Sequence, residues 1–377
     1  MSTTWNEYNQ TEKPALNLFE HLGYQVYEDQ GPEREDHHHP LLLDNLRQAI
    51  KRLNPWINEN NLAKAINQIR PARIRATNLM EANQIIYKHL VQYISLTQDL
   101  GQGKKGQTVK YIDFDNPSNN EYLVLNQYRV IGKEIIKPDI VVFINGIPIA
   151  VIECKSDTNC DEPEKEAIKQ LRRYQRETEK LFYTNQILVA AWRDSASASA
   201  IGSPAREFKE WKDPYPDTKE AIPVENPSLQ DILLYSMFQK ERLLDLILNY
   251  TVFDQDLKKI ARYQQYRSVE KALQRIQEAD KLQDRNGTVW HTQGSGKSLS
   301  MLFLATKLKR WINPTMLIVT DRVDLDDQIK ATFEDCGFPN PYQAENIEDL
   351  KRLIKSDANR TITTLIQKFQ EPEGKYP

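Results

Sequence analysis

The chain has 377 residues, of which 40% are apolar and 27% are charged, and its formal net charge is −3. This length predicts two or three domains with buried cores. The acidic balance argues against a protein that coats DNA through charge alone, but it allows a local basic groove. No apolar run approaches the ~18 residues that a membrane span requires. Cys154, Cys160 and Cys336 fit no zinc spacing, so we expect a reducing, cytoplasmic location.

The N-terminal part of the chain combines helical and strand-like patterns. Apolar residues recur at helical spacing over 10–22 and predict a helix there, which Gly23 ends. A strand is expected over 24–28, and mainly helices are expected over 31–100. Further along, apolar runs between turn signals predict four strands, at Tyr111–Phe114, Tyr122–Ile131, Ile140–Ile144 and Ile147–Cys154.

The pattern then changes twice. A charged helix is predicted over 164–180 and a strand over 182–191, whereas residues 193–230 lose periodicity and predict a loop between two domains. Helices return over 229–248 and 265–284. From there strands alternate with helices, which predicts a parallel, doubly wound sheet. Its expected elements are strands over 288–291, 315–320 and 361–366 and helices over 298–311 and 325–336.

The pattern P-D…E-x-K spans two predicted strands, with Asp139 on the first and Glu153 and Lys155 on the second. The two carboxylates are hard oxygen ligands of the kind that Mg²⁺ binds. The ion can acidify a water molecule and stabilise charge on a phosphate. Lys155 shares a strand face with Glu153, because side chains alternate. The pattern predicts a metal-dependent nuclease centre, with Asp139 and Glu153 as metal ligands and Lys155 holding the attacking water or the phosphate.

The nuclease interpretation sets a condition on the hairpin between these strands. If Asn145 and Gly146 formed a strict two-residue turn with regular pairing, Asp139 would lie opposite Ile152 and face away from Glu153. An odd-length loop or one bulge is therefore required. Gly146 suits a left-handed bulge position, and Pro148 donates no ladder hydrogen bond.

Two helices offer additional side chains. Gln170 and Tyr174 are four residues apart and share a helical face, so we expect both beside the nuclease centre. On the first predicted helix, Glu12 and Glu20 are both candidates for a further acidic member, with Glu12 preferred.

Three consecutive histidines, His37–His39, follow an acidic run. A metal site is one interpretation. A solvated loop is the preferred one, because the run fixes no coordination geometry.

A phosphate-binding loop is predicted between a strand and a helix. The pattern G-x-x-x-x-G-K-[ST] is matched at its last three positions, whereas His291 occupies the first glycine position. Backbone N–H groups at the start of the helix would surround a phosphate, Lys297 would reach the β/γ oxygens, and Ser298 would contact Mg²⁺. The expected ATP-binding residues are Thr292, Gln293, Gly294, Ser295, Gly296, Lys297 and Ser298.

Upstream of this loop, Gln265 resembles the adenine-reading glutamine of superfamily 2 helicases, since an amide can pair with adenine N6 and N7. Gln264 is the alternative, and the spacing to Ser268 favours Gln265. Downstream, the segments 320–322 and 363–369 resemble helicase motifs that contact the DNA backbone.

The order of these motifs, ending in Trp290–Ser298, resembles the R subunit of type I restriction enzymes, the HsdR family. The segments 41–55 and 226–253 resemble it as well. This resemblance implies an α/β chain with a RecB-like PD-(D/E)xK nuclease domain over 1–195. A helical connection over 196–253 and part of a RecA-like, superfamily 2 helicase domain with a parallel sheet over 254–377 would follow. It also implies that Asp139, Glu153 and Lys155 carry cleavage, with Gln170 and Tyr174 assisting.

The resemblance further implies Mg²⁺ and ATP as cofactors, double-stranded DNA as substrate, and methylation and specificity subunits as partners. The chain departs from the family pattern at its C-terminal end, where no D-E-x-H box follows Ile366. We therefore expect an N-terminal fragment that does not hydrolyse ATP alone. A different class of function also fits these residues: a translocase or remodelling ATPase whose N-terminal domain binds DNA without cleaving it.

Overall fold

The computed structural model describes residues 7–28, 34, 36–156, 161–192, 194–254, 256–338, 341–355 and 359–369, so Cys160 and the segment 370–377 lie outside the described part. The contacts divide the chain into two units. Unit 1 contains residues 1–248 and 257–260, and unit 2 contains 249–256 and 261–377. The segment 196–248, expected to connect two domains, belongs to unit 1. No helix among the described residues is long and apolar enough to cross a membrane.

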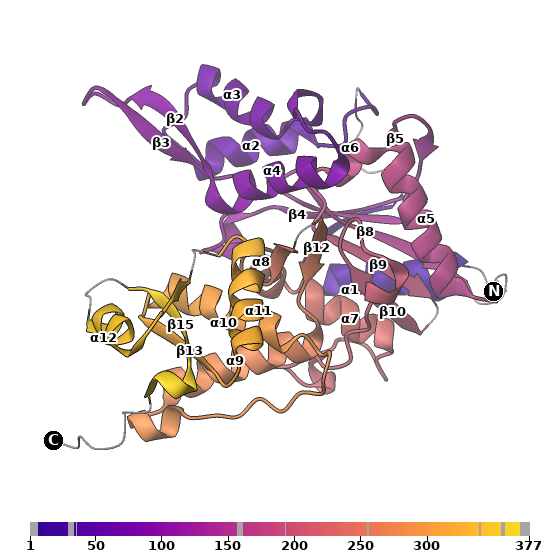
Figure 1. Ribbon diagram of the computed structural model, residues 1–377. Helices are drawn as coiled ribbons and strands as arrows, with labels where there is room; N and C mark the ends of the chain where they lie inside the picture. Colours follow the sequence, from indigo (N-terminus) through magenta and orange to yellow (C-terminus); the bar gives the residue numbers. More distant parts are fainter. Residues whose placement is uncertain are drawn as a thin grey trace, which may run out of the picture. The chain divides into compact units, whose positions relative to one another are not determined.

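Unit 1 is built on a mixed six-stranded sheet in the order β1-β4-β7-β8-β9-β10 (Figure 1). Strand β7 is antiparallel to both of its neighbours, β4 and β8, whereas β1 is parallel to β4 and β9 is parallel to β8. All residues of β4 and β7 are buried, which fits central strands covered on both faces. The strands are β1 Gln25–Tyr27, β4 Tyr122–Asn126, β7 Ile140–Ile144, β8 Ile147–Lys155, β9 Ile187–Trp192 and β10 Ser195–Ser199.

Helices cover this sheet. The crossover helix α5 (Pro163–Glu177) packs on β8 and β9, and α1 (Lys13–His21) packs on β1, β4 and α7 (Leu229–Phe238). A short π-helix, η1 (Tyr8–Glu12), precedes α1 and lies against β8. The other α-helices and strands are α2 Leu43–Leu53, α3 Glu59–Ile69, α4 Leu79–Gln92, α6 Glu179–Phe182, α8 Lys240–Asn249, the hairpin of β2 Ile94–Asp99 and β3 Lys104–Val109, the pair β5 Val130–Ile131 and β6 Ile135–Ile136, and β12 Leu257–Ile260. Short 3-10 helices lie at Pro71–Arg73, Pro117–Asn119, Ala205–Glu207 and Lys219–Ala221.

Three sequence-based expectations for unit 1 were wrong. The expected strand Tyr111–Phe114 is irregular. The expected strand Tyr122–Ile131 is broken at Gln127, whose φ of 53° lies in the left-handed region and turns the chain out of the ladder. The expected loop 193–230 begins with β10, an antiparallel edge strand of small residues that lack a strong β signal.

Unit 2 contains a three-stranded parallel sheet in the order β13-β15-β14, which confirms the predicted parallel sheet. Its strands are β13 Met316–Thr320, β14 Tyr342–Gln343 and β15 Thr361–Leu365, and its other elements are β11 Thr251–Asp254, α9 Tyr263–Glu278, α10 Lys297–Trp311, α11 Val323–Asp335 and α12 Ile347–Lys355. The expected strand 288–291 does not form. Trp290 is 91% exposed, and in the described part of the chain this segment has no ladder partner, which a strand requires.

Candidate functional site

The β7–β8 hairpin places Asp139 beside Glu153. Asn145 and Gly146 form a two-residue turn with φ of 52° and 76°, and Ile144 pairs with Ile147. The ladder then shifts register, so that Ile140 faces Ile152. Consequently Asp139, one residue before β7, lies opposite Glu153 and on its side of the sheet.

The required bulge is therefore present, but not at Gly146. In the β7–β8 register Phe143 pairs with Pro148 and Val142 pairs with Ala150, which leaves Ile149 as the extra residue of β8. Pro148 has no N–H to donate, which weakens the regular ladder at this position.

The centre is deeply buried and includes the ammonium group of Lys155. Asp139 is 7% exposed and Glu153 is fully buried. The Cys154 N–H donates to Asp139 Oδ2 at 2.8 Å, and Lys155 Nζ donates to Glu153 Oε1 at 2.7 Å. Lys155 Nζ also donates to the Cys154 carbonyl. The structure thus brings the three residues of the P-D…E-x-K pattern together.

Burial dominates the electrostatics of these groups. It raises the pKa of Glu153 well above its usual range, and the neighbouring Asp139 raises it further. Burial also raises the pKa of Asp139. Burial alone would lower the pKa of Lys155, but the carboxylates of Glu153 and Asp139 raise it above its ordinary value, so the lysine is a cation at neutral pH.

Gln170 and Tyr174 lie together on α5, as predicted. Gln170 Nε2 donates to Tyr174 Oη at 2.6 Å, and the Tyr174 hydroxyl donates to the carbonyl of Lys137 at 3.5 Å. Burial raises the pKa of Tyr174, and the charge of Glu153 adds to this effect. The phenol therefore stays protonated, close to the carboxylate pair.

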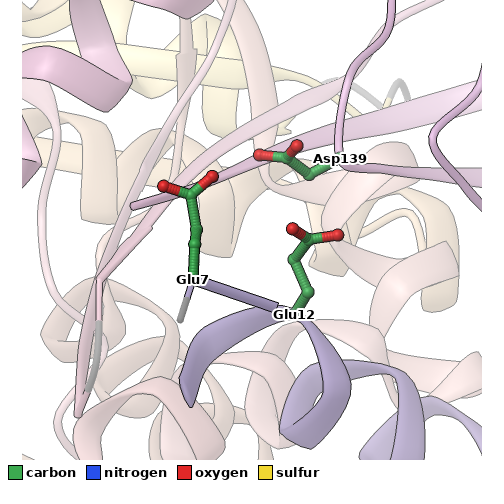
Figure 2. Close-up of side chains that lie close together, drawn as sticks. All are labelled: Glu7, Glu12 and Asp139. Carbon is green, nitrogen blue, oxygen red and sulfur yellow. The ribbon is translucent and has the colours of Figure 1, made fainter. Parts of the chain in front are cut away.

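The N-terminal segment adds two acids. One carboxylate oxygen from each of Glu7, Glu12 and Asp139 lies within 4.8 Å of the others, and Figure 2 shows the three carboxylates turned toward a common space. Glu12 is 5% exposed, and burial together with Asp139 raises its pKa to about 7. Glu20, the alternative candidate, is exposed on α1.

Two amides hold Glu12 and Asp139 in place. Gln127 Nε2 donates to Glu12 Oε2 at 3.2 Å and to Asp139 Oδ1 at 3.0 Å. Asn126 Nδ2 donates to the same Glu12 oxygen and to the Asp139 carbonyl, both at 2.8 Å. The strand β4 ends at Asn126, and Gln127 has a left-handed backbone. At this end of the strand both amides face Glu12 and Asp139.

The donor set fits a hard divalent cation. Glu153 Oε2 is buried and has no hydrogen-bond partner among the described residues, which is costly for a carboxylate oxygen. Asp139 lies beside it, and carboxylate oxygens are the ligands that Mg²⁺ and Ca²⁺ take in proteins. A cation between Asp139 and Glu153 would satisfy this oxygen.

In unit 2 a helix begins directly after the predicted phosphate loop, as expected. Gly296 has a φ of 83° and precedes α10, which begins at Lys297. Lys297 Nζ donates to the carbonyls of His291 and Thr292 at 3.1 and 2.9 Å, and Ser295 Oγ donates to the Thr292 carbonyl at 2.8 Å. The ammonium thus lies within the loop, where a phosphate would offer it better acceptors than carbonyls.

Gln265 contacts this loop directly. Its Nε2 donates to the Gly296 carbonyl at 3.0 Å, and its Oε1 accepts from the Arg262 N–H at 2.9 Å. Reading adenine would require the amide to release these bonds. Gln264, the alternative, lines a cavity of about 720 Å³ together with Trp290 and His291.

The three histidines do not converge on one point. Arg70 Nε donates to His39 Nε2 at 2.9 Å, and the guanidinium of Arg34 lies beside His37 Nδ1 at 3.0 Å. Burial lowers the pKa of His39 to about 4, and Arg70 adds to this effect. His38 is exposed. The preferred interpretation of a solvated loop was wrong for His39, which is a buried neutral side chain.

Sequence reasoning missed Glu7, Asn126 and Gln127. Glu7 lies five residues before Glu12 in a segment with no charge pattern, so nothing singled it out. A signal for the other two was available, because a polar Asn-Gln pair directly follows the apolar run Tyr122–Leu125 and marks the end of a strand.

Fold and site together define a mixed α/β protein with a buried carboxylate–lysine centre in one unit. The other unit contains a three-stranded parallel sheet and a glycine-rich loop that leads into helix α10. Residues 4–196 match the family described as type I restriction enzyme R protein N terminus (HSDR_N), and residues 264–377 match the SWI2/SNF2 ATPase family. The chain therefore belongs to the type I restriction enzyme R protein family, which confirms the resemblance found in the sequence.

Curated relatives agree with this assignment. The type I restriction enzyme HindI endonuclease subunit of Haemophilus influenzae is 33% identical over 357 residues, which are 89% of this chain and 33% of the relative. The putative type I restriction enzyme MjaIXP endonuclease subunit of Methanocaldococcus jannaschii is 32% identical over 408 residues, which are 99% of this chain and 38% of the relative. The chain thus spans about a third of the length of these relatives.

Proposed function

We propose that this chain supplies the nuclease centre and part of the ATP-driven motor of a cytoplasmic type I restriction enzyme that cleaves double-stranded DNA. The observation that carries the proposal is the buried Glu153 carboxylate, which has one unpartnered oxygen, between Asp139 and Lys155. The family assignment and the names of the relatives support it. The crossover helix α5 after β8 fits a RecB-like PD-(D/E)xK arrangement of unit 1.

Each residue of the centre has a separate task in this proposal. Asp139 and Glu153 would hold Mg²⁺, which acidifies a water molecule and neutralises charge on the phosphodiester when it is bound. Lys155 stays charged beside Glu153 and would orient the attacking water or the phosphate oxygen. Glu12 adds a further carboxyl group close to Asp139. Tyr174 and Gln170 add neutral hydrogen-bonding groups from α5.

For the motor, we propose ATP as the nucleotide. The N–H groups at the start of α10 would surround the phosphates, with Lys297 and Ser298 at the β/γ oxygens and Mg²⁺. Gln265 then couples α9 to the loop through Gly296. The recognition of DNA sequence and of methylation would belong to methylation and specificity subunits.

The test uses an R subunit that contains this chain and a complete motor, assembled with methylation and specificity subunits. Plasmid DNA should be cleaved with Mg²⁺ and ATP and remain intact with EDTA. Lys155→Ala should abolish cleavage and leave DNA-stimulated ATP hydrolysis unchanged, whereas Lys169→Ala, an exposed lysine on α5, should change neither. If the wild type hydrolysed ATP on DNA but never cleaved it, unit 1 would be a DNA-binding module instead.

A further inference from the structure

We propose that a cavity between the end of α3 and the helix α4 binds the phosphate backbone of double-stranded DNA through Arg73 and Arg75. None of the residues that line this cavity belongs to the carboxylate–lysine centre, so the site is an additional DNA contact within unit 1. The inference rests on the proposed function, because that proposal supplies double-stranded DNA as the substrate.

The cavity is formed by the connection between two helices. The helix α3 ends at Ile69, the short 3-10 helix Pro71–Arg73 follows, and α4 begins at Leu79. The helices α3 and α4 pack against each other (Figure 1). A cavity of about 530 Å³ lies where this connection crosses the helices, and side chains of both helices and of the connection line it.

The connection is rich in arginine. Residues 70–75 include Arg70, Arg73 and Arg75. Arg70 Nε donates to His39 Nε2, whereas Arg73 and Arg75 line the cavity and are exposed. Neither of these two guanidinium groups has a hydrogen bond or ion pair in the described part of the chain. Each therefore offers several N–H donors, in the fork that matches two oxygens of one phosphate.

The other polar side chains around the cavity suit an anion as well. Asn67 and Gln68 bring amides from α3, His89 comes from α4, and no residue that lines the cavity is acidic. His89 Nδ1 donates to the Gln68 carbonyl at 3.1 Å. The last carbonyls of a helix carry partial negative charge and would repel an anion, so this hydrogen bond covers one unfavourable group.

The lining favours a phosphate backbone over a nucleotide. Its apolar residues are Ile74 and Ile85, so no aromatic ring is present on which a base could stack. Because Arg73 and Arg75 are exposed, a bound phosphate can belong to a strand that continues beyond the cavity. Contacts of this kind hold a duplex without reading its sequence. They also give a chain with a net charge of −3 the local positive charge that binding to DNA requires.

The experiment measures the binding of a labelled DNA duplex to the purified 377-residue chain by fluorescence anisotropy. The titrations are made in EDTA, where the acids of the candidate centre have no divalent ion, and are repeated from about 50 to about 200 mM salt. Combining Arg73→Ala with Arg75→Ala should weaken binding at least about tenfold. The slope of log affinity against log salt should decrease by about 1.8, because each phosphate contact contributes about 0.9.

Two further pairs of substitutions make the result specific. Lys64→Ala with Lys88→Ala removes the same charge from exposed positions on α3 and α4 that do not line the cavity. This control should keep the wild-type slope. Arg73→Lys with Arg75→Lys should also keep most of the slope but bind more weakly, because an ammonium group lacks the guanidinium fork. Circular dichroism should show every variant folded.

Three results would overturn the proposed DNA contact: no DNA binding by the wild type, a slope that the arginine substitutions leave unchanged, or an equal loss in the lysine control. Calorimetry with inorganic phosphate separates a small-anion site from a backbone site. Phosphate binding that the arginine substitutions abolish, with DNA binding unchanged, would also overturn it. None of these results affects the cleavage test of the proposed nuclease. Conversely, an assembled enzyme that never cleaves DNA would remove the nuclease, while a slope that still decreased in the arginine variant would retain this contact.

Discussion

Asp139 lies directly across the β7–β8 ladder from Glu153, although the turn between the strands has only two residues. The relationship depends on Ile149, which is the extra residue of β8 in this register. Without the bulge the two carboxylates would lie on opposite faces of the sheet, because a shift of one residue reverses the direction of every side chain. The candidate centre is thus a consequence of hairpin geometry.

The hairpin turn itself should be sensitive to substitution. A Cβ at Gly146 would lie 2.5 Å from the Leu42 carbonyl oxygen and 2.8 Å from the Leu46 nitrogen, at a φ of 76°. Gly146→Ala should therefore lower the free energy of unfolding by more than about 2 kcal/mol, from backbone strain and the close contact together.

Gly101 offers a matched control for this prediction. It has a φ of 92°, but a Cβ there would meet nothing within 4 Å. Gly101→Ala should therefore cost only the backbone term, roughly 1–2 kcal/mol. Urea denaturation of both variants measures the difference. Equal costs at the two positions would show that the contact of Gly146 with Leu42 and Leu46, at the start of α2, is not tight.

The parts of the candidate centre that could be predicted from the sequence are those that depend on residues close together in the chain. Alternation within a strand placed Lys155 with Glu153, and helical spacing placed Gln170 with Tyr174. The location of the bulge was not predictable, because Pro148 and Gly146 both weaken a ladder and only pairing in the folded sheet decides between them. Glu7 was missed because its neighbours in space, Lys155 and Asp139, are more than 130 residues away in the sequence.

The same limit applies to unit 2. The helix after the loop was predicted from adjacent residues, and it forms as α10. The expected strand 288–291 has a suitable local pattern but finds no ladder partner in the described part of the chain. Strand formation depends on distant pairing, which propensity does not contain.

Glu12 should make the metal-free protein less stable as pH rises. Its pKa is raised from an ordinary value of 4.5 to about 7, chiefly by burial. The folded state therefore binds a proton that the unfolded state releases, and this contribution to stability is fully present below about pH 4.5 and is lost as pH rises to about 7.

Glu12→Gln removes this ionisation and keeps an acceptor oxygen for Asn126 and Gln127. In EDTA this variant should melt at a higher temperature than the wild type at pH 8 but not at pH 4. Its free energy of unfolding at pH 8 should be larger by on the order of 3 kcal/mol. Thermal melts of both proteins across this pH range measure the effect. A stabilisation of equal size at every pH would show that the ionisation of Glu12 is not its source.

His39 should make the protein less stable as pH falls, which is the opposite of the effect expected for Glu12. Burial and Arg70 lower its pKa from 6.5 to about 4, so the folded state holds the neutral ring. Its contribution to stability is present above about pH 6.5 and is lost as pH falls toward 4. His39→Gln should therefore weaken the pH dependence of unfolding in this window, whereas His38→Gln, at an exposed neighbour, should leave it unchanged. Urea midpoints at pH 4.5 and 7 give the comparison, and parallel shifts in the two variants would contradict the role of His39.

Gln265 links the helix α9 to the predicted phosphate loop, and the residue is only 2% exposed. Because both ends of the amide bond to backbone groups of the protein, Gln265→Ala should loosen the loop at Gly296 and weaken the binding of ATP and of GTP by the same factor. Gln264→Ala, next to the cavity that Trp290 lines, should weaken ATP more than GTP if the base binds there. Fluorescence titration with labelled nucleotides measures all four affinities, with Lys297→Ala as the variant that lacks the phosphate contact. A loss of ATP binding alone in Gln265→Ala, with GTP unchanged, would show that Gln265 leaves the loop to read adenine.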